Sequence, residues 1–396
     1  MQVQVLRGEN QIGSSIVKIV SGTTRLILDV GSEIESTHTP KVPRIEGLFR
    51  GEAGYDAVLI SHHFLDHAGL IPYVVPQIPI YMSRRTYEFY RYTAEYQRMN
   101  VLREPILFED QEQDENGHYT FVIGDIRVTP ILCSDYGFDA WMFLLESGGE
   151  RILYTGGLCN DSREISEDLL GSIPQADTLV VEGTMLSRPF SGLGSERMVE
   201  QKLEELMQPL PPVFLIASST NVRRFESFAE AASRSSRTLL VDVYQAGILS
   251  EGVRELMNEK QHPEIRVFLS GSRGREQTDI QRFSHQQIDK DMIPFKHIAM
   301  CVRPSRVMEQ YLSELNAVHP LSGSVLIVSM WRGFREQKDV KRFLEHCEKM
   351  GMRIEYVHTA GTLDLAVLKA VAKKSGAEKI IPVHAYEPEK LAALLR

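Results

Sequence analysis

The chain has 396 residues, a formal net charge of −9 and four scattered cysteines. Its length predicts two domains, or one domain with a large insertion. The acidic balance argues against a general basic field for nucleic acid, and the cysteine spacing argues against a disulfide framework or a thiolate zinc cluster. With no apolar run near roughly 18 residues and no secretory signal layout, we expect a cytoplasmic protein without a membrane segment.

The first 190 residues predict a β-rich domain. Short strands are expected at residues 4–6, 15–20, 24–30 and 56–61, and helices at 69–75 and 86–99. Further strands are expected at 121–123, 126–130, 142–146 and 151–155. Gly-rich turns at 124–125 and 148–149 separate these later strands, which is typical of a β-meander.

From about Glu196 the pattern changes to amphipathic helices between apolar strands. The strands are expected at 213–217, 238–243, 265–269, 297–302 and 324–329. This alternation favours a parallel, doubly wound sheet. The chain then ends in a predicted strand at 354–358, a helix at 364–374 and a strand at 379–383, which we interpret as a βαβ return.

A histidine-rich loop follows the apolar strand at 56–61. It reads Ile60-Ser-His-His-Phe-Leu-Asp-His-Ala-Gly69. Imidazole and carboxylate groups are the usual nitrogen and oxygen ligands of zinc. In an extended loop, residues two apart point the same way, so His62 and position 64 would face one ion together. Position 64 is Phe64, which has no ligand atom.

Nine motifs in order resemble the β-CASP branch of the metallo-β-lactamase superfamily, the group of RNase J-like ribonucleases and the pre-mRNA 3′-end-processing endonuclease. The motifs are Leu26–Asp29, His62–His67, 128–130 with 138–140, Tyr154–Gly156, Val181–Thr184 with 187–188, Ser218–Asn221, Arg303–Ser305, Val357–Gly361 and Ile381–His384. The resemblance implies an α/β chain, with a four-layered αββα metallo-β-lactamase fold and an inserted doubly wound α/β β-CASP domain. The implied bounds are 1–190 and 353–396 for the first domain and 191–352 for the insertion.

Carried over position by position, the resemblance implies a degenerate dimetal centre. The family's first metal is held by histidines at positions 62, 64 and 135, where this chain has His62, Phe64 and Asp135. The second metal's ligands are all present, as Asp66, His67 and His384. The bridging carboxylate is replaced by Gly157.

Other positions of the family's centre are mixed. Glu182 keeps the acidic residue at the entry to the inserted domain, and it joins Asp66 as a candidate catalytic carboxylate. In the late signature, Ala360 stands in place of a serine and Thr362 in place of a histidine. The missing imidazole leaves no obvious general acid for a leaving group.

We therefore expect at most one zinc or manganese ion per chain, held by Asp66, His67 and His384. His62 and Asp135 are further candidate ligands. A bridging hydroxide between two metals would lack support without the carboxylate and the second imidazole. Two alternatives stay open: the histidines are hydrogen-bonded relics without metal, and Asp135 caps its loop.

Seven polar residues are predicted to contact a substrate or ligand. They are Ser218, Asn221, Arg223, Arg303, Ser305, Thr359 and Thr362. Those at 218–223 resemble a phosphate-contact loop at a strand-to-helix turn. The alternative is that they cap the helix that follows.

The favoured hypothesis is a catalytically silent or much weakened pseudoenzyme that acts as a binding or regulatory subunit. Its partner would be a protein, such as an active paralogue, and a homo-oligomer is compatible with the sequence. RNA binding is expected to be weak and strongly salt-dependent. The rival hypothesis is a mononuclear-zinc hydrolase, a phosphodiesterase or ribonuclease. Restoring Phe64→His, Asp135→His and Gly157→Asp together is expected to raise metal binding towards two ions.

Overall fold

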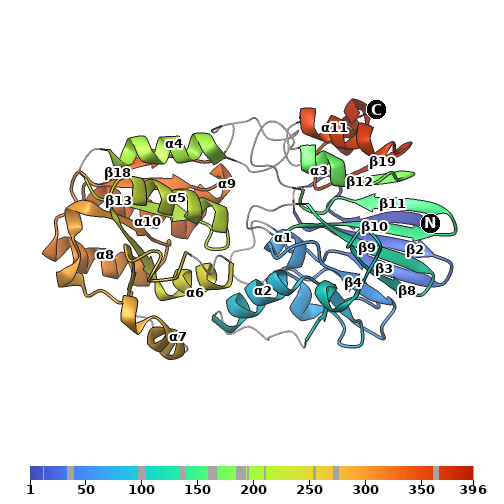
Figure 1. Ribbon diagram of the computed structural model, residues 1–396, viewed down its shortest axis with the longest axis horizontal. Helices are drawn as coiled ribbons and strands as arrows, with labels where there is room; N and C mark the ends of the chain where they lie inside the picture. Colours follow the sequence, from blue (N-terminus) through green and yellow to red (C-terminus); the bar gives the residue numbers. More distant parts are fainter. Residues whose placement is uncertain are drawn as a thin grey trace. The chain divides into compact units, whose positions relative to one another are not determined.

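The computed structural model describes residues 1–11, 13–33, 40–96, 104–133, 139–158, 167–183, 193, 196–208, 211–252, 256–270, 276–359 and 365–395. The chain divides into two compact units, the first formed by residues 1–191 and 361–396 and the second by residues 192–360 (Figure 1). Each unit has its own sheets and its own apolar core. Among the described residues, no helix is both long and apolar enough to cross a bilayer.

The first sheet of unit 1 begins antiparallel and continues parallel. Its strands, in spatial order, are β1 (Gln2–Arg7), β2 (Ile16–Ser21), β3 (Thr24–Leu28), β4 (Ala57–Leu59), β5 (Ile80–Met82) and β6 (Ile106–Leu107). Pairing is antiparallel from β1 to β3 and parallel from β3 to β6. Strand β3 has apolar side chains on both faces, because the sheet is covered on both sides.

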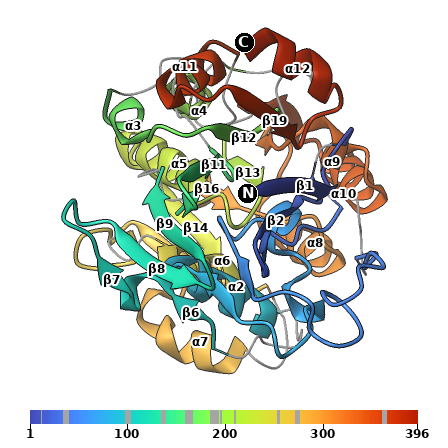
Figure 2. The ribbon, with the colours of Figure 1, turned by 90° about the vertical axis from the view of Figure 1, so that its right-hand side faces the viewer.

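The second sheet of unit 1 joins a meander to the end of the chain. Its strands are β7 (Glu112–Gln113), β8 (Tyr119–Ile123), β9 (Ile126–Leu132), β10 (Trp141–Ser147), β11 (Glu150–Tyr154), β12 (Thr178–Glu182) and β19 (Lys379–Val383). Neighbours from β7 to β11 are antiparallel. Strands β11, β12 and β19 are parallel, so β19 lies beside β12 at one edge of the sheet (Figure 2).

The apolar clusters show four layers in unit 1. One cluster joins the two sheets face to face, with Leu28 and Phe143 among its members. A second covers the other face of the first sheet beneath α1 (Leu65–Ala68), the 3₁₀ turn Ile71–Tyr73 and α2 (Arg84–Tyr96). A third covers the other face of the second sheet beneath α3 (Glu167–Ser172), α11 (Leu365–Ser375) and α12 (Pro388–Leu395). The predicted αββα arrangement is confirmed.

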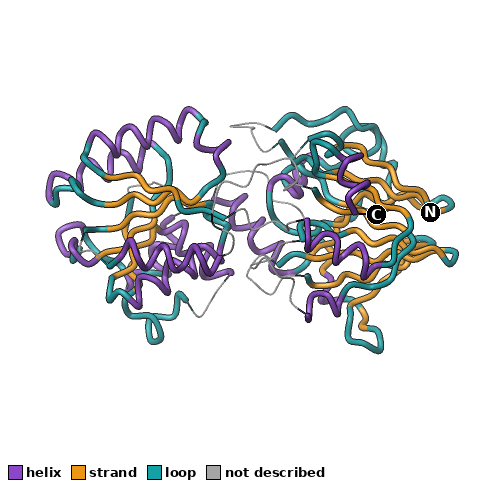
Figure 3. The backbone as a smooth tube through the Cα atoms, turned by 90° about the horizontal axis from the view of Figure 1, so that it is seen from above, coloured by secondary structure: helices purple, strands orange, loops and turns teal. Residues whose placement is uncertain are grey.

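Unit 2 is a parallel α/β layer structure. Its strands are β13 (Val213–Ala217), β14 (Thr238–Asp242), β15 (Ile265–Phe268), β16 (Ile298–Cys301), β17 (Val325–Ser329) and β18 (Arg353–Tyr356), in the order β15-β14-β16-β13-β17-β18. Its helices are α4 (Glu196–Met207), α5 (Val222–Arg234), α6 (Val243–Gly252), α7 (Glu276–Arg282), α8 (Arg306–Val318), α9 (Arg332–Arg335) and α10 (Lys338–Lys349). Every strand pair in this sheet is parallel, and helices lie on both sides of its strands (Figure 3).

Two sequence-based assignments differ from the structure. The strand predicted at 354–358 was assigned with residues 353–396 to the first domain, but β18 pairs with β17 in the sheet of unit 2. Helix α10 connects β17 to β18 in a strand–helix–strand crossover, and such a crossover places the second strand parallel to the first in the same sheet. Residues 69–75 form only the 3₁₀ turn Ile71–Tyr73, since Gly69 caps the end of α1 and Pro76 disfavours the helical conformation at Val75.

A buried ion pair fastens α4 to α5 in unit 2. The guanidinium of Arg224 donates to both carboxylate oxygens of Glu196, at 2.6 Å each, and also to the Ser329 hydroxyl. Ser227 donates to the same carboxylate at 2.9 Å. Burial would raise the pKa of Glu196, but the hydrogen bond and charge of Arg224 outweigh it and the pKa is lowered. Glu196 is therefore charged at neutral pH.

We predict that Arg224→Met lowers the free energy of unfolding of unit 2 by about 3–5 kcal/mol, because it leaves a buried carboxylate without its cation. The matched control is Arg234→Met on the same helix, whose half-exposed ion pairs with Glu200 and Glu204 are worth about 0–1 kcal/mol. Urea unfolding followed by Trp331 fluorescence, in a Trp141→Phe background, measures both. Equal losses in the two variants would contradict the prediction.

Candidate metal centre

Asp29 is the anchor of the histidine loop. It follows β3, is fully buried and has a left-handed backbone with φ 58°. Its carboxylate accepts hydrogen bonds from the Ser61 backbone N–H at 2.7 Å, the Ser61 hydroxyl at 2.8 Å and the Tyr154 hydroxyl at 2.6 Å. His67 Nδ1 lies 2.7 Å from the same group. One carboxylate thus ties β3, the histidine loop and β11 together.

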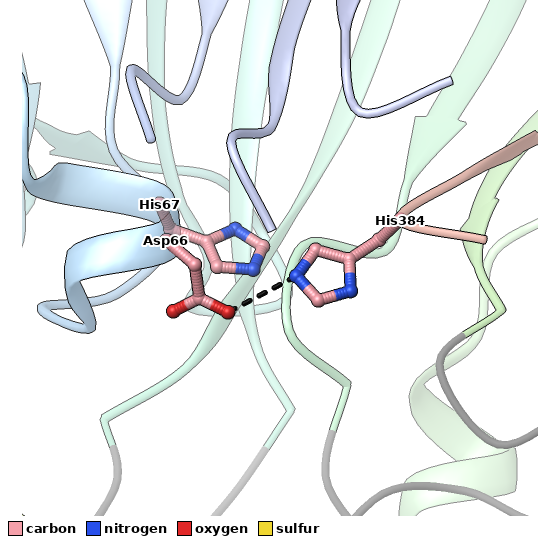
Figure 4. A group of neighbouring side chains, drawn as sticks. All are labelled: Asp66, His67 and His384. Atoms are coloured by element: carbon pink, nitrogen blue, oxygen red, sulfur yellow. Dashed lines mark hydrogen bonds and ion pairs between the residues drawn. The ribbon is translucent and has the colours of Figure 1, made fainter. Parts of the chain in front are cut away.

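Three potential ligands converge beside this anchor (Figure 4). Asp66 and His67 lie on α1, and His384 directly follows β19. The ligand atoms of these three residues lie within 4.8 Å of one another, and His384 Nε2 is 3.0 Å from Asp66 Oδ2. Nδ1 of His67 donates a hydrogen bond to the Asp29 carboxylate, which leaves Nε2 as the nitrogen that could bind a metal.

The residues fit one zinc ion. Asp-His-His is a usual ligand set for a zinc ion that keeps one position open, and a carboxylate behind one histidine is the usual support for such a ligand. His384 also has a left-handed backbone, with φ 56°, and its N–H donates to the Gly8 carbonyl at 2.7 Å. For a residue with a β-carbon this conformation costs free energy, and it is typical of functional sites.

His62 is buried and turned to a different partner. Its Nδ1 lies 2.9 Å from the Ser61 hydroxyl, which itself donates to Asp29, so His62 Nδ1 is the donor. A β-carbon placed on Gly157 would lie 2.3 Å from Cε1 and 2.8 Å from Nε2 of His62. The imidazole therefore fills the space that any side chain at position 157 would need. Among the described residues, His62 is outside the converging ligand group.

Aromatic packing surrounds the other side of His62. The half-buried Phe64 ring meets His62 edge-on, with centroids 5.0 Å apart. It meets His63 in the same way at 4.8 Å, and His63 stacks on Phe89 of α2 at 4.6 Å. His63 thus faces away from the ligand group, as the alternation of an extended loop predicts. Phe64 thus packs between two imidazoles and brings no ligand atom to this side of the site.

The charges of the ligand group are set by their neighbours. Burial would lower the pKa of His67, but the charge and hydrogen bond of Asp29 raise it to about 9. Burial would raise the pKa of Asp66, but the hydrogen bond from His384 and the charge of His67 hold it well below its usual range. Burial holds the pKa of His62 well below 6.5. At neutral pH the metal-free site therefore holds a charged His67, a charged Asp66 and a neutral His62.

Other predicted site residues are spread over both units. Glu182 is buried at the end of β12 in unit 1, where its charge adds to the rise in the pKa of His67. Asp135 and Thr362 lie outside the described residues. Thr359 is described and buried, in unit 2.

The remaining predicted contacts follow strands β13 and β16 of unit 2. Asn221 caps α5 by accepting from Arg224 N at 3.1 Å, as in the helix-cap alternative, and Ser305 caps α8 by accepting from Met308 N at 3.1 Å. Ser218 contacts the Thr220 hydroxyl, Arg223 lies 3.7 Å from Glu226, and Arg303 pairs with Asp242. Because β13 and β16 are adjacent and parallel, these residues share the carboxyl edge of the sheet, where α/β proteins commonly bind ligands.

Sequence reasoning missed several partners. Ser61 and Tyr154 complete the Asp29 anchor, and Asp242 and Tyr244 hold Arg303, whose guanidinium carbon lies 4.6 Å from the Tyr244 ring centroid. A signal for Tyr154 was present, because it begins the Tyr-Thr-Gly motif next to position 157. No local signal marked Asp242, which is simply the last residue of an apolar strand.

Comparison with known proteins places this geometry in a family context. The family model described as "Beta-lactamase superfamily domain" matches residues 24–209. The chain is 26% identical over 232 residues to an RNase J-like protein of Methanocaldococcus jannaschii, covering 54% of this chain and 52% of that protein. It is 25% identical over 204 residues to cleavage and polyadenylation specificity factor subunit 3 of Dictyostelium discoideum, covering 46% and 26%.

A solved structure matches over nearly the whole chain. It is a protein of unknown function from Enterococcus faecalis V583, with a TM-score of 0.76 and 19% identity, covering 98% of this chain and 95% of that one. At that identity the match supports the fold alone. The curated relatives are longer: the aligned part spans about half of the archaeal protein and about a quarter of the Dictyostelium protein.

The His67–Asp29 pair predicts a pH dependence of stability. A folded pKa of about 9, against 6.5 when unfolded, corresponds to about 3 kcal/mol. Folded protein binds the extra proton, so this contribution is complete below pH 6.5 and is lost as pH rises through about 9. Chelator-treated protein should therefore lose about 3 kcal/mol of unfolding free energy between about pH 7 and pH 10, measured by urea titration.

Asp29→Asn is the control for this prediction, because it removes the charge that raises the pKa of His67. The variant should start less stable and show a much smaller loss over the same pH range. An NMR titration of the His67 ring should have its midpoint near pH 9 in the unaltered protein. A midpoint near 6.5, or the same loss of stability in Asp29→Asn, would refute the pairing.

The contact between His62 and Gly157 gives a second prediction. Gly157→Ala should cost about 1–3 kcal/mol because its methyl group collides with a buried ring. In a His62→Ala background, the same change should cost at least about 1 kcal/mol less. Gly171→Ala is the control, since Gly171 lies in α3 with nothing within 4 Å. Urea unfolding of the four variants tests this, and additive costs at 62 and 157 would rule the contact out.

Proposed function

We propose that this chain is a binding or regulatory protein with a degenerate dimetal centre, because residues 24–209 match the β-lactamase superfamily domain and the relatives include an RNase J-like protein and a cleavage and polyadenylation factor subunit. In this proposal the centre binds at most one zinc or manganese ion, at Asp66, His67 and His384. Catalysis is absent or much weakened. The protein acts with a protein partner, such as an active paralogue, in the cytoplasm.

The observation that carries the proposal is the position of His62. In the family pattern, position 157 supplies the carboxylate that bridges two metals. Here it is glycine, and the His62 imidazole would lie 2.3 Å from any β-carbon at that position. The bridge is therefore missing and its space is filled. A simple Gly157→Asp replacement would not restore it unless His62 also moved away.

The aromatic contacts of Phe64 support the same proposal. Two-metal hydrolysis needs a second ion held by its own ligands, so that a hydroxide is generated between the two ions. Phe64 replaces one of the family's imidazoles and packs against His62 and His63. Burial holds the pKa of His62 low, and its Nδ1 donates to Ser61. A single imidazole at Nε2 is a weak basis for a second metal site.

The three converging residues Asp66, His67 and His384 support the binding of a single metal ion. A zinc ion bound there would supply a positive charge and a Lewis acid, joined to α1 and to the end of β19. The chain's own residues do the rest: Asp29 orients His67, and His384 contacts Asp66 directly. Metal binding would therefore link segments more than 300 positions apart in the chain and stabilise unit 1.

The rival function is a mononuclear-zinc phosphodiesterase or ribonuclease. The convergence of three ligand atoms within 4.8 Å favours it, as does the carboxylate behind His67. The names of several relatives point the same way: Endoribonuclease YSH1 of Gibberella zeae is 26% identical over 294 residues, covering 64% of this chain and 35% of that protein. Against it, position 362 has threonine where the family has the imidazole that would assist a leaving group.

We predict that protein purified without chelator contains at most one zinc or manganese ion per chain, measured by mass spectrometry. His384→Ala should abolish metal binding and metal-dependent thermal stabilisation. His319→Ala, a histidine of unit 2, should leave both unchanged. Two fully occupied ions per chain would contradict the degenerate centre, and an empty site would exclude the mononuclear enzyme.

RNA turnover separates the two functions. We expect negligible cleavage of RNA with zinc, manganese or magnesium, and weak, salt-dependent RNA binding, because the chain is net acidic. Cleavage that disappears in His67→Ala would establish the rival. Cleavage that survives this substitution would come from a contaminant and would leave the degenerate-centre proposal standing.

A further inference from the structure

A compact group of arginines and aromatic rings lies in unit 2, where β17 and β18 end. We call it the Arg–aromatic patch: Trp331, Arg332, Phe334, Arg335 and Tyr356. Residues 331–335 follow β17 and include the short helix α9, and Tyr356 is the last residue of β18. Because β17 and β18 are adjacent and parallel, both segments belong to the carboxyl edge of the sheet.

The rings and guanidinium groups of the patch are arranged by direct contacts. The guanidinium carbon of Arg335 lies 4.3 Å from the centroid of the Tyr356 ring, a cation–π contact. The Trp331 and Phe334 rings meet edge to face, with centroids 5.7 Å apart. Glycine at position 333 permits this placement of the indole, because a β-carbon there would lie 2.0 Å from Cζ3 of Trp331. The indole therefore occupies the space that a β-carbon at position 333 would need.

The patch is accessible and contains two guanidinium groups that form no direct ion pair. Tyr356 is 57% exposed, and Arg332 is exposed. Neither Arg332 nor Arg335 forms a direct ion pair with a carboxylate in the described part of the chain, although the charge of each adds to the lowering of the pKa of Glu336 by Lys341. The Nε of Arg335 is buried without a hydrogen-bond partner there. Burying such a donor without an acceptor costs free energy.

We propose that the Arg–aromatic patch is the docking site for an acidic, aromatic-containing segment of a partner protein. Trp, Tyr and Arg are the residues that dominate binding energy at protein interfaces, and here they occur together. The two unpaired guanidinium groups complement two carboxylates of the partner. This inference rests on the proposed binding role, but it uses none of the metal-centre residues.

The surrounding charges favour a short acidic peptide over nucleic acid. The neighbouring carboxylates already have cations: Glu336 pairs with Lys341 at 2.6 Å, and Asp339 pairs with Arg342 at 2.6 Å. Among the described residues 331–342, Lys341 and Arg342 form ion pairs and Lys338 is the only other cation besides Arg332 and Arg335, so this segment offers three cations without an ion pair and no longer track. A nucleic acid carries a charge at every nucleotide and needs such a track. Two carboxylates beside an aromatic side chain need only what the patch offers.

The test uses fluorescent poly(Glu,Tyr) as the probe, with poly-glutamate and oligouridylate for comparison, on the full chain. We expect poly(Glu,Tyr) to bind more tightly than the other two polymers. The double variant Arg332→Glu, Arg335→Glu should weaken its binding by at least roughly tenfold. The matched control is Lys296→Glu, an exposed lysine that precedes β16 at the amino edge of the same sheet, which should change binding less than about twofold.

Gly333→Ala supplies a variant without a charge change. It displaces the Trp331 indole and should weaken poly(Glu,Tyr) binding several-fold while the thermal melting of the protein stays close to that of the unaltered chain. Tighter binding of oligouridylate that is lost in the same arginine variant would overturn the proposal in favour of nucleic acid. Equal binding by the double variant and Lys296→Glu would overturn it altogether. Metal content measured on the same samples reports separately on the proposed function.

Discussion

The hydrogen bonding of Asp29 is the constraint on which the metal centre depends. Its buried carboxylate accepts from Ser61, Tyr154 and His67, which come from three separate segments of the chain. This fixes the histidine loop against β11 and presents Nε2 of His67 towards Asp66 and His384. Through Ser61, the same carboxylate also positions the His62 ring beside Gly157. In the proposed function, one carboxylate therefore supports the Asp66, His67 and His384 ligand set and also lies behind the Ser61–His62 segment, whose imidazole occupies the space beside Gly157.

Much of the fold followed from the sequence, because its signals are local. Apolar strands such as Val213–Ala217 and Lys379–Val383 have turn signals at their ends and were predicted at the bounds the structure shows. Which sheet a strand joins is not a local property. Strand β18 was assigned to the wrong unit because its partner, β17, is chosen by the crossover through α10. Pro76 did carry a signal against a helix through Val75, which the apolar pattern before it outweighed.

The site was predictable only in part. Asp66, His67 and His384 were named together from the resemblance, and the structure brings their ligand atoms within 4.8 Å. The role of His62 was not predictable, because it depends on the absence of a β-carbon 95 positions later in the chain. Likewise, the side chains of Asn221 and Ser305 act as helix caps, and the pattern Ser/Asn before a helix fits capping and phosphate contact equally well.

Whether the site holds one zinc ion or two is tested most directly by anomalous diffraction at the zinc edge, from crystals grown with excess zinc and no chelator. We expect one peak per chain, within bonding distance of Asp66, His67 and His384, with the His62 ring still packed on Gly157. A second peak within about 4 Å of the first, coordinated by His62, would contradict the claim that the dinuclear centre has been lost.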